Sequence, residues 1–131
     1  MKRNPNLNYA CLPMENAYNV RELGGYATKK GSVTNHHQFL RSENLTDITE
    51  EDKTFLIEYG LSAIIDLRSR EEALIYPNPF RGNAAVNYMN CPLITEDVLD
   101  LRAVKEKGFD PGAFYIKLVE YKEMICRIFH F

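Results

Sequence analysis

Cysteine is scarce in this sequence. Its 131 residues include three cysteines, Cys11, Cys91 and Cys126, an odd number without any Cys-x-x-Cys spacing. This pattern excludes a disulfide framework and a cysteine-based zinc site. An excess of either charge is also absent, because 16 basic residues stand against 18 acidic ones. The balance gives no electrostatic footprint for nucleic acid or for an anionic membrane surface.

Long apolar runs are missing as well. No window of the sequence is long and apolar enough to span a bilayer. The basic start of the chain, Met1–Asn8, has no apolar stretch behind it, so we expect no secretory signal peptide. Together with the cysteine pattern, these absences lead us to expect a reducing, cytoplasmic location.

The composition that remains is ordinary for a globular domain. Apolar residues make up 45% of the chain and charged residues 26%, and both values are typical of soluble folds. A chain of this length can bury a usable core. We therefore expect residues 1–131 to belong to a single domain, with residues 1–17 as a loosely structured lead-in.

Two helices are well marked in the middle of the chain. Thr49 can cap the first, the acidic residues after it favour the positive N-terminal end, and Gly60 gives the stop. The second is predicted to start at Ser69, because Ser-Arg-Glu-Glu has the form of a capping box, and to end by Pro77.

Three segments are predicted as strands: 38–42, 61–67 and 85–91. The second is a nearly continuous apolar run, as expected for a parallel strand that is covered on both faces. Cys91, at the end of the third, is expected to be a buried small hydrophobe. Strands that alternate with helices predict an α/β fold, with a mostly parallel sheet and flanking helices.

A final helix is predicted from Asp110-Pro111, a favourable cap and first-turn pair, to the end of the sequence. Apolar residues recur along it at helical spacing and are expected to be core: Phe114, Leu118, Tyr121, Ile125, Ile128 and Phe129. No stop signal follows this apolar face. We therefore expect the sequence to end inside a domain.

Three segments carry the strongest functional signal. They are Asn-Val-Arg-Glu-Leu-Gly-Gly-Tyr at 19–26, Leu-Arg-Ser-Glu-Asn-Leu at 40–45, and Ile-Ile-Asp-Leu-Arg-Ser at 64–69. In this order and spacing they resemble the bacterial protein-tyrosine/serine phosphatases related to the tyrosine and lipid phosphatases of pathogens. The resemblance covers about residues 16–92, and more weakly the last helix. It implies a phosphatase-like fold.

The resemblance also implies a reaction. The family uses a Cys-x5-Arg loop whose backbone amides and arginine hold the phosphate. The thiolate attacks phosphorus, an acid protonates the leaving oxygen, and water hydrolyses the phosphocysteine. No metal or organic cofactor is implied. The substrates would be phosphotyrosine, phosphoserine or phosphoinositide monoesters.

None of the three cysteines fits that loop. The sixth residue after Cys11 is Ala17, the sixth after Cys91 is Asp97, and no residue stands six positions after Cys126. In the family the loop follows a helix such as 111–131. We therefore expect the sequence to be the N-terminal part of a phosphatase domain, truncated before the nucleophile loop.

Asp66 is the candidate catalytic residue. It lies at the C-terminal end of a predicted buried strand, where open α/β sheets place their sites, and the matching family residue is a proposed general acid. Asp66 could equally cap or brace the turn before the helix that starts at Ser69. Arg68 could face a bound phosphate, but pairing with Glu71 or Glu72 is favoured.

The remaining candidates lie earlier in the chain. Arg21 and Arg41 are candidates for the same substrate-binding cleft, although each could instead brace a loop, which is favoured for Arg21. Gly24-Gly25 is interpreted as a turn rather than a phosphate cradle. The pair His36-His37 has no partner at ligand spacing and is interpreted as a solvated loop pair.

Three hypotheses follow. The first is the N-terminal portion of a cysteine-dependent protein-tyrosine phosphatase. The second is a catalytically dead, phosphatase-like binding or regulatory module that pairs with another chain. The third is a different α/β phosphate-binding domain that shares only the Asp-Leu-Arg turn. Under the first hypothesis, we expect the chain to self-associate or to pair with a second chain that supplies the missing C-terminal half. Exposed sheet edges and apolar patches favour such pairing.

Overall fold

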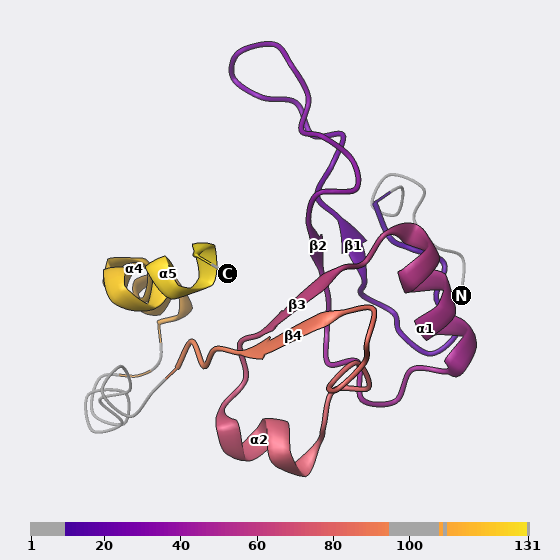
Figure 1. Cartoon of the computed structure of the whole chain (residues 1–131). Coiled ribbons are helices and arrows are strands. Elements are labelled where there is room, and N and C mark those ends of the chain that lie inside the picture. The colour runs from indigo at the N-terminus through magenta and orange to yellow at the C-terminus, as the bar shows by residue number, and fades with distance from the viewer. Residues whose placement is uncertain (1–9, 95–107, 109, 131) are drawn as a thin grey trace. The chain divides into compact units, whose positions relative to one another are not determined.

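The computed structural model describes residues 10–94, 108 and 110–130 (Figure 1). The chain divides into two compact units, Met1–Ser62 with Asn83–Val86 and Ala63–Gly82 with Asn87–Phe131. We call them the first and the second unit and describe each by itself. Among the described residues, no helix has the length and apolar character needed to cross a membrane.

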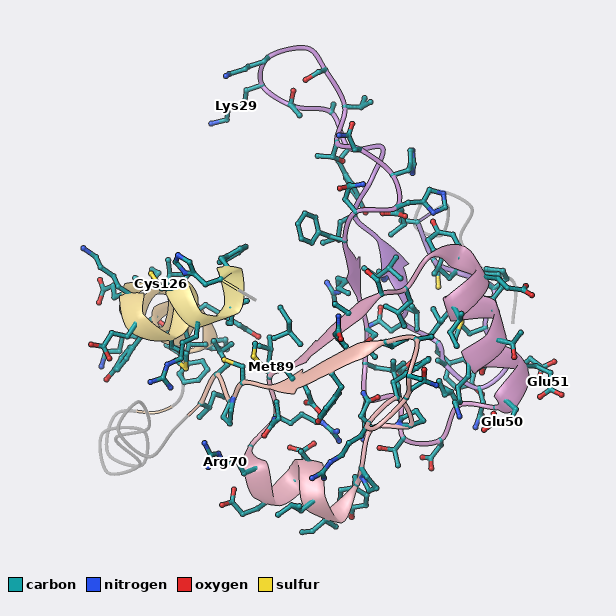
Figure 2. The ribbon with its side chains drawn as sticks, viewed as in Figure 1. Lys29, Glu50, Glu51, Arg70, Met89 and Cys126 are labelled. Atoms are coloured by element: carbon teal, nitrogen blue, oxygen red, sulfur yellow. The ribbon has the colours of Figure 1, made fainter. Side chains whose placement is uncertain are left out.

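The first unit contains a small antiparallel sheet. Strand β1, Arg21–Glu22, pairs with strand β2, Leu40–Arg41. The long loop between them carries Lys29 near its tip (Figure 2). Antiparallel strands can be joined by such a loop, whereas parallel strands need a crossover. The prediction of a mostly parallel sheet was therefore wrong for this unit, where no helix separates the two strands.

Residues 10–17 are not the loosely structured lead-in that we expected. Four of their apolar side chains are buried: Ala10, Leu12, Met14 and Ala17. The buried carboxylate of Asp52 accepts hydrogen bonds from the backbone N–H groups of Glu15 at 2.7 Å and Asn16 at 2.9 Å. These contacts come from residues more than 30 positions apart, so no local pattern could have revealed them. Residues 1–9 lie outside the described residues.

Helix α1, Glu50–Tyr59, has the ends that the sequence predicted. Thr49 caps it in a reciprocal capping box with Asp52, and Gly60 closes it at φ 108°. A left-handed φ of this kind is readily available to glycine and costly for other residues. Leu56 is 1% exposed and anchors the helix in the core of the unit.

Gly24 is held at a close backbone approach. A Cβ atom at this position would lie 2.5 Å from the Cα atom of His36 and 2.8 Å from the carbonyl oxygen of Asn35. No side chain can be accommodated there without moving backbone. Its neighbour Gly25 has φ 81° and supports the turn interpretation of the Gly-Gly pair.

The second unit is built on a parallel pair of strands. Strand β3, Ala63–Asp66, runs alongside β4, Asn87–Asn90, in the register Ala63 to Asn87 (Figure 1). In the sequence, the two strands are separated by helix α2, Arg70–Ile75. The Ser69 hydroxyl caps this helix, as predicted. Cys91 is buried, as predicted.

The cover of β3 is incomplete. Ala63 is exposed, and Ile64 and Ile65 are half-buried, although the apolar run predicted a strand covered on both faces. The most deeply buried large side chain of this unit is Phe80, at 0% exposed. It lies in the segment between α2 and β4 rather than in a strand.

The final helix is interrupted. It consists of α4, Pro111–Glu120, and α5, Lys122–Phe129, which meet at Tyr121 with φ −76° and ψ 76°. Asp110 caps α4 as predicted. Of the six positions predicted as core, only Leu118 is buried, and Phe129 is 75% exposed. The prediction of a single core helix was wrong, since the helix is interrupted at Tyr121 and five of the six positions are not buried.

Gly24→Ala should destabilise the first unit more than Gly31→Ala does. The added methyl group at Gly24 meets backbone atoms that cannot move aside. Gly31 stands in open space at φ 79°, so alanine there incurs only the left-handed backbone penalty of ~1–2 kcal/mol. Thermal melts of the two variants measure the difference. Equal melting temperatures would contradict the close approach at Gly24.

Candidate functional site

Asp66 is the last residue of β3, and its partner in the register of β4 is Asn90. Ile64, two residues earlier, pairs with Tyr88. Because side chains two residues apart share a face of a strand, Asp66, Tyr88 and Asn90 lie on one face of the sheet. The parallel pairing therefore brings together polar residues that are more than 20 positions apart.

Asp66 is 7% exposed, and its carboxylate accepts four hydrogen bonds. Its Oδ1 accepts from the backbone N–H of Arg68 at 3.1 Å and from Arg68 Nε at 2.9 Å. Its Oδ2 accepts from Arg68 Nη2 at 2.7 Å and from the Tyr88 hydroxyl at 2.8 Å. A carboxylate has about four lone-pair positions, so all of them are used.

The guanidinium of Arg68 contacts two different segments of the chain. Besides its paired contact with Asp66, its Nη1 donates to the carbonyl oxygen of Tyr76 at 3.0 Å and lies 4.0 Å from Glu72 Oε1. Its side chain is 16% exposed. The predicted ion pair with Glu72 is therefore present but long, and the main partner is Asp66. Arg68 ties the end of β3 to the end of α2.

The electrostatics of the site favour an ionised Asp66. Burial raises the pKa of Asp66, but the hydrogen bonds from Arg68 and Tyr88 and the Arg68 charge outweigh burial, and the pKa lies below its ordinary value. The hydrogen bond to Asp66 raises the pKa of Arg68. Burial and the same carboxylate raise the pKa of Tyr88. The site holds one negative and one positive charge, with a neutral phenol beside them.

Asn90 completes the site through the backbone. Its side-chain amide donates to the carbonyl oxygens of Asp66 at 3.0 Å and Arg68 at 2.9 Å. These bonds hold the turn that follows β3. Sequence reasoning missed both Tyr88 and Asn90, because the segment was interpreted only as a strand. The sequence Asn-Tyr-Met-Asn held a signal for them, because Tyr88 and Asn90 are two residues apart and therefore lie on one face of a strand.

A comparison with known families identifies the family of the chain. A family model described as "Tyrosine phosphatase family" matches residues 12–127. The chain belongs to the tyrosine phosphatase family. A search of curated proteins gives no match. The family match rules out the third hypothesis, an unrelated α/β phosphate-binding domain.

In this tyrosine phosphatase chain, the two earlier arginines lie opposite each other. Arg21 and Arg41 are direct partners across β1 and β2. Arg21 Nε donates to Asn19 Oδ1 at 2.6 Å, a bracing contact of the kind that was favoured for it, and Arg41 is exposed. Like charges directly across a strand pair are destabilising. Both residues belong to the first unit, whereas Asp66 and Arg68 belong to the second.

The 19–26 segment also holds a buried carboxylate. Glu22 accepts hydrogen bonds from Gly24 N at 2.9 Å, His37 N at 3.1 Å and the Tyr59 hydroxyl at 2.6 Å. The bond to Glu22, and then burial, raise the pKa of Tyr59 to about 12. His37 is exposed in a turn, as expected of a solvated loop residue, and its ring lies 4.3 Å from the Tyr59 ring.

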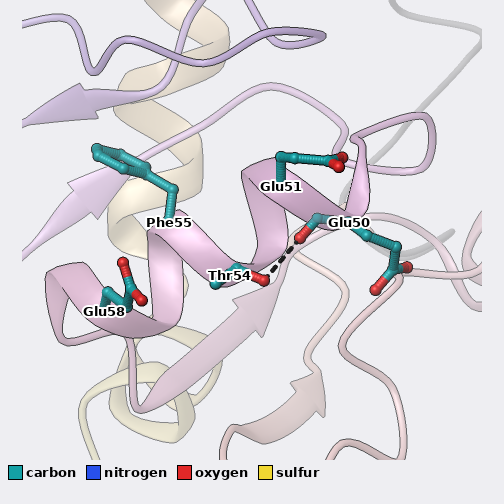
Figure 3. A pocket seen from close by; sticks show the side chains of 5 residues that line it. All are labelled: Glu50, Glu51, Thr54, Phe55 and Glu58. Carbon is teal, nitrogen blue, oxygen red and sulfur yellow. Dashed lines mark hydrogen bonds between the residues drawn. The ribbon is translucent and has the colours of Figure 1, made fainter.

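A shallow hollow of about 310 Å³ lies along α1, lined by Glu50, Glu51, Thr54, Phe55 and Glu58 (Figure 3). All five residues come from one helix. Three of them are acidic, which disfavours the binding of a phosphate ester. The hollow is therefore not a candidate for the phosphatase site. The described part of the chain also holds no group of three or more His, Cys, Asp or Glu side chains that could bind a metal ion.

Arg68→Lys should lower the stability of the second unit, although it keeps the charge. Lysine cannot reproduce the paired contact with Asp66 and also reach Tyr76, and leaving such bonds unmade costs about 1–3 kcal/mol. The matched control is Arg70→Lys, at an exposed position at the start of α2 (Figure 2). Thermal melts compare the two variants. An Arg68→Lys protein as stable as the control would exclude a bracing role.

Proposed function

We propose that this chain is the N-terminal portion of a cysteine-dependent protein-tyrosine phosphatase. Its substrates would be phosphotyrosine monoesters, with phosphoserine and phosphoinositides as further candidates. The observation that carries the proposal is the Asp66–Arg68 pair at the C-terminal end of β3, in a chain that matches the tyrosine phosphatase family over residues 12–127. The carboxyl ends of parallel strands are where open α/β sheets bind ligands.

The chemistry needs a nucleophile that these 131 residues do not contain, since no cysteine is followed by arginine at the sixth position. Cys91 is buried, Cys126 is exposed, and Cys11 lies between these extremes. In the proposal, the Cys-x5-Arg loop is supplied by residues outside this sequence. The three unpaired cysteines support the reducing, cytoplasmic location that we include in the proposal.

Asp66 has the role of general acid in this proposal. It would protonate the leaving oxygen, and Arg68, Arg41 and Arg21 would contribute to binding the phosphorylated substrate. In the structure described here Asp66 is paired with Arg68, an arrangement suited to a carboxylate. To act as an acid it must first take up a proton and loosen that pairing. Neither a metal ion nor an organic cofactor enters the reaction.

A second candidate function is a catalytically dead, phosphatase-like module that pairs with another chain. The observation that favours it is the apolar surface of α4, where Tyr115 and Ile116 are each 65% exposed and Val119 is 71% exposed. Large apolar patches on soluble proteins commonly mark interaction sites. The partner would be a second copy or a chain that supplies the nucleophile loop.

The 131-residue chain alone should not hydrolyse p-nitrophenyl phosphate above background. Without the thiolate there is no covalent path, and proton transfer from Asp66 could contribute only ~10²–10⁴-fold. The measurement is a phosphatase assay with and without vanadate, which blocks thiolate-dependent enzymes. Vanadate-sensitive turnover by the pure chain would refute the assignment of the nucleophile to residues outside it.

In a tyrosine phosphatase that carries the loop, Asp→Asn at the position of Asp66 should lower kcat much more than it changes KM. The loss should grow as the leaving oxygen becomes more basic, because an acid matters most for poor leaving groups. A series of aryl phosphates measures this dependence. An unchanged kcat together with a lower melting temperature would assign Asp66 to bracing.

A further inference from the structure

The two oxygens of the Asp66 carboxylate have different partners. Both partners of Oδ1 are nitrogen donors of Arg68. Oδ2 has one Arg68 nitrogen and the hydroxyl of Tyr88. An arginine or a backbone N–H can only donate a hydrogen bond, whereas a phenolic hydroxyl can donate or accept. Tyr88 is therefore the one contact of this carboxylate that can serve both of its protonation states.

We propose that Tyr88 is the positioning residue for the proton of Asp66, and that this proton resides on Oδ2. When Asp66 is ionised, the Tyr88 hydroxyl donates to Oδ2 at 2.8 Å, as the structure shows. When Asp66 is protonated, the hydroxyl turns and its oxygen accepts a hydrogen bond from the protonated Oδ2. The contact persists in both states, so the carboxyl group keeps its orientation while its charge changes.

Several charged groups surround this pair. Arg68 faces Asp66 from the turn after β3 and Glu72 faces Arg68 from α2. The positive charge of Arg81, in the segment between α2 and β4, acts on Tyr88 and favours its ionised form. The positive charge of Arg68 opposes protonation of Asp66. A donor to Oδ2 adds to that opposition, because hydrogen bonds to a charged group are stronger than neutral ones.

The inference rests on the proposed function and refines it. Asp66 would take a proton from solvent water onto Oδ2, held there by Tyr88. In the reaction, the thiolate of the proposed Cys-x5-Arg loop forms an S–P bond while the P–O bond and the O–H bond at Oδ2 break. The electron pair of the P–O bond goes to the leaving phenolic oxygen, which receives the proton. Tyr88 itself gains and loses nothing, so it acts by orienting Asp66.

The test follows the carboxyl carbon of Asp66 by NMR over a pH titration of the 131-residue chain. In Tyr88→Phe the titration midpoint should rise by about one pH unit, a tenfold change in proton affinity, because the ionised form loses a donor. The control Tyr115→Phe, at an exposed position of α4, should leave the midpoint unchanged. A midpoint that does not move in Tyr88→Phe, with unaltered amide shifts in β3 and β4, overturns the proposal.

A second variant covers the case in which Tyr88→Phe perturbs the sheet. Asp66→Asn removes the charge but keeps an oxygen and adds an amide that can donate to the Tyr88 oxygen. The ring-carbon titration of Tyr88 should then fall toward its ordinary value of 10.0. An unchanged Tyr88 midpoint overturns the proposal as well. Neither measurement needs turnover, so a failure of the phosphatase assignment would show separately.

Discussion

Three buried carboxylates, Glu22, Asp52 and Asp66, are each satisfied by hydrogen bonds from more than one chain segment. Burying a charge is costly unless donors surround it. Each carboxylate therefore joins the segments that provide those donors. Glu22 links the loop after β1 to α1, Asp52 links residues 15–16 to α1, and Asp66 links the end of β3 to β4. The rest of the structure depends on these three centres.

The same requirement creates a conflict at Asp66. The contacts that allow its burial also hold its pKa below the ordinary value, whereas a general acid needs a raised one. As a donor, Tyr88 contributes to the lowered pKa of Asp66, although its hydroxyl can form a hydrogen bond with either protonation state of the carboxyl group. The family match and the position at the strand end support a catalytic role, and the contacts with Arg68 support a structural one. Asp66 can have both roles only if protonation of its carboxylate is coupled to the loss of its contacts with Arg68.

Much of the local structure was predictable because its signals are local. Caps and stops lie within a few residues of the helices that they bound, so Thr49, Gly60 and Ser69 were assigned correctly. The antiparallel pairing of β1 and β2 was not predictable, because strands of two residues have no hydrophobic period. The interruption at Tyr121 was missed as well, since neither glycine nor proline marks it.

The sequence by itself determined the α/β class, the helix ends, Asp66 and Arg68 as candidates, and the absence of a Cys-x5-Arg motif from these 131 residues. These depend on residue type and short spacing. Only the tertiary structure decided what the candidates contact. It paired Arg68 with Asp66 and brought Tyr88 and Asn90 to the same site, although they stand 22 and 24 positions from Asp66. Strand register sets such contacts, and register arises from pairing between distant segments that no local pattern encodes.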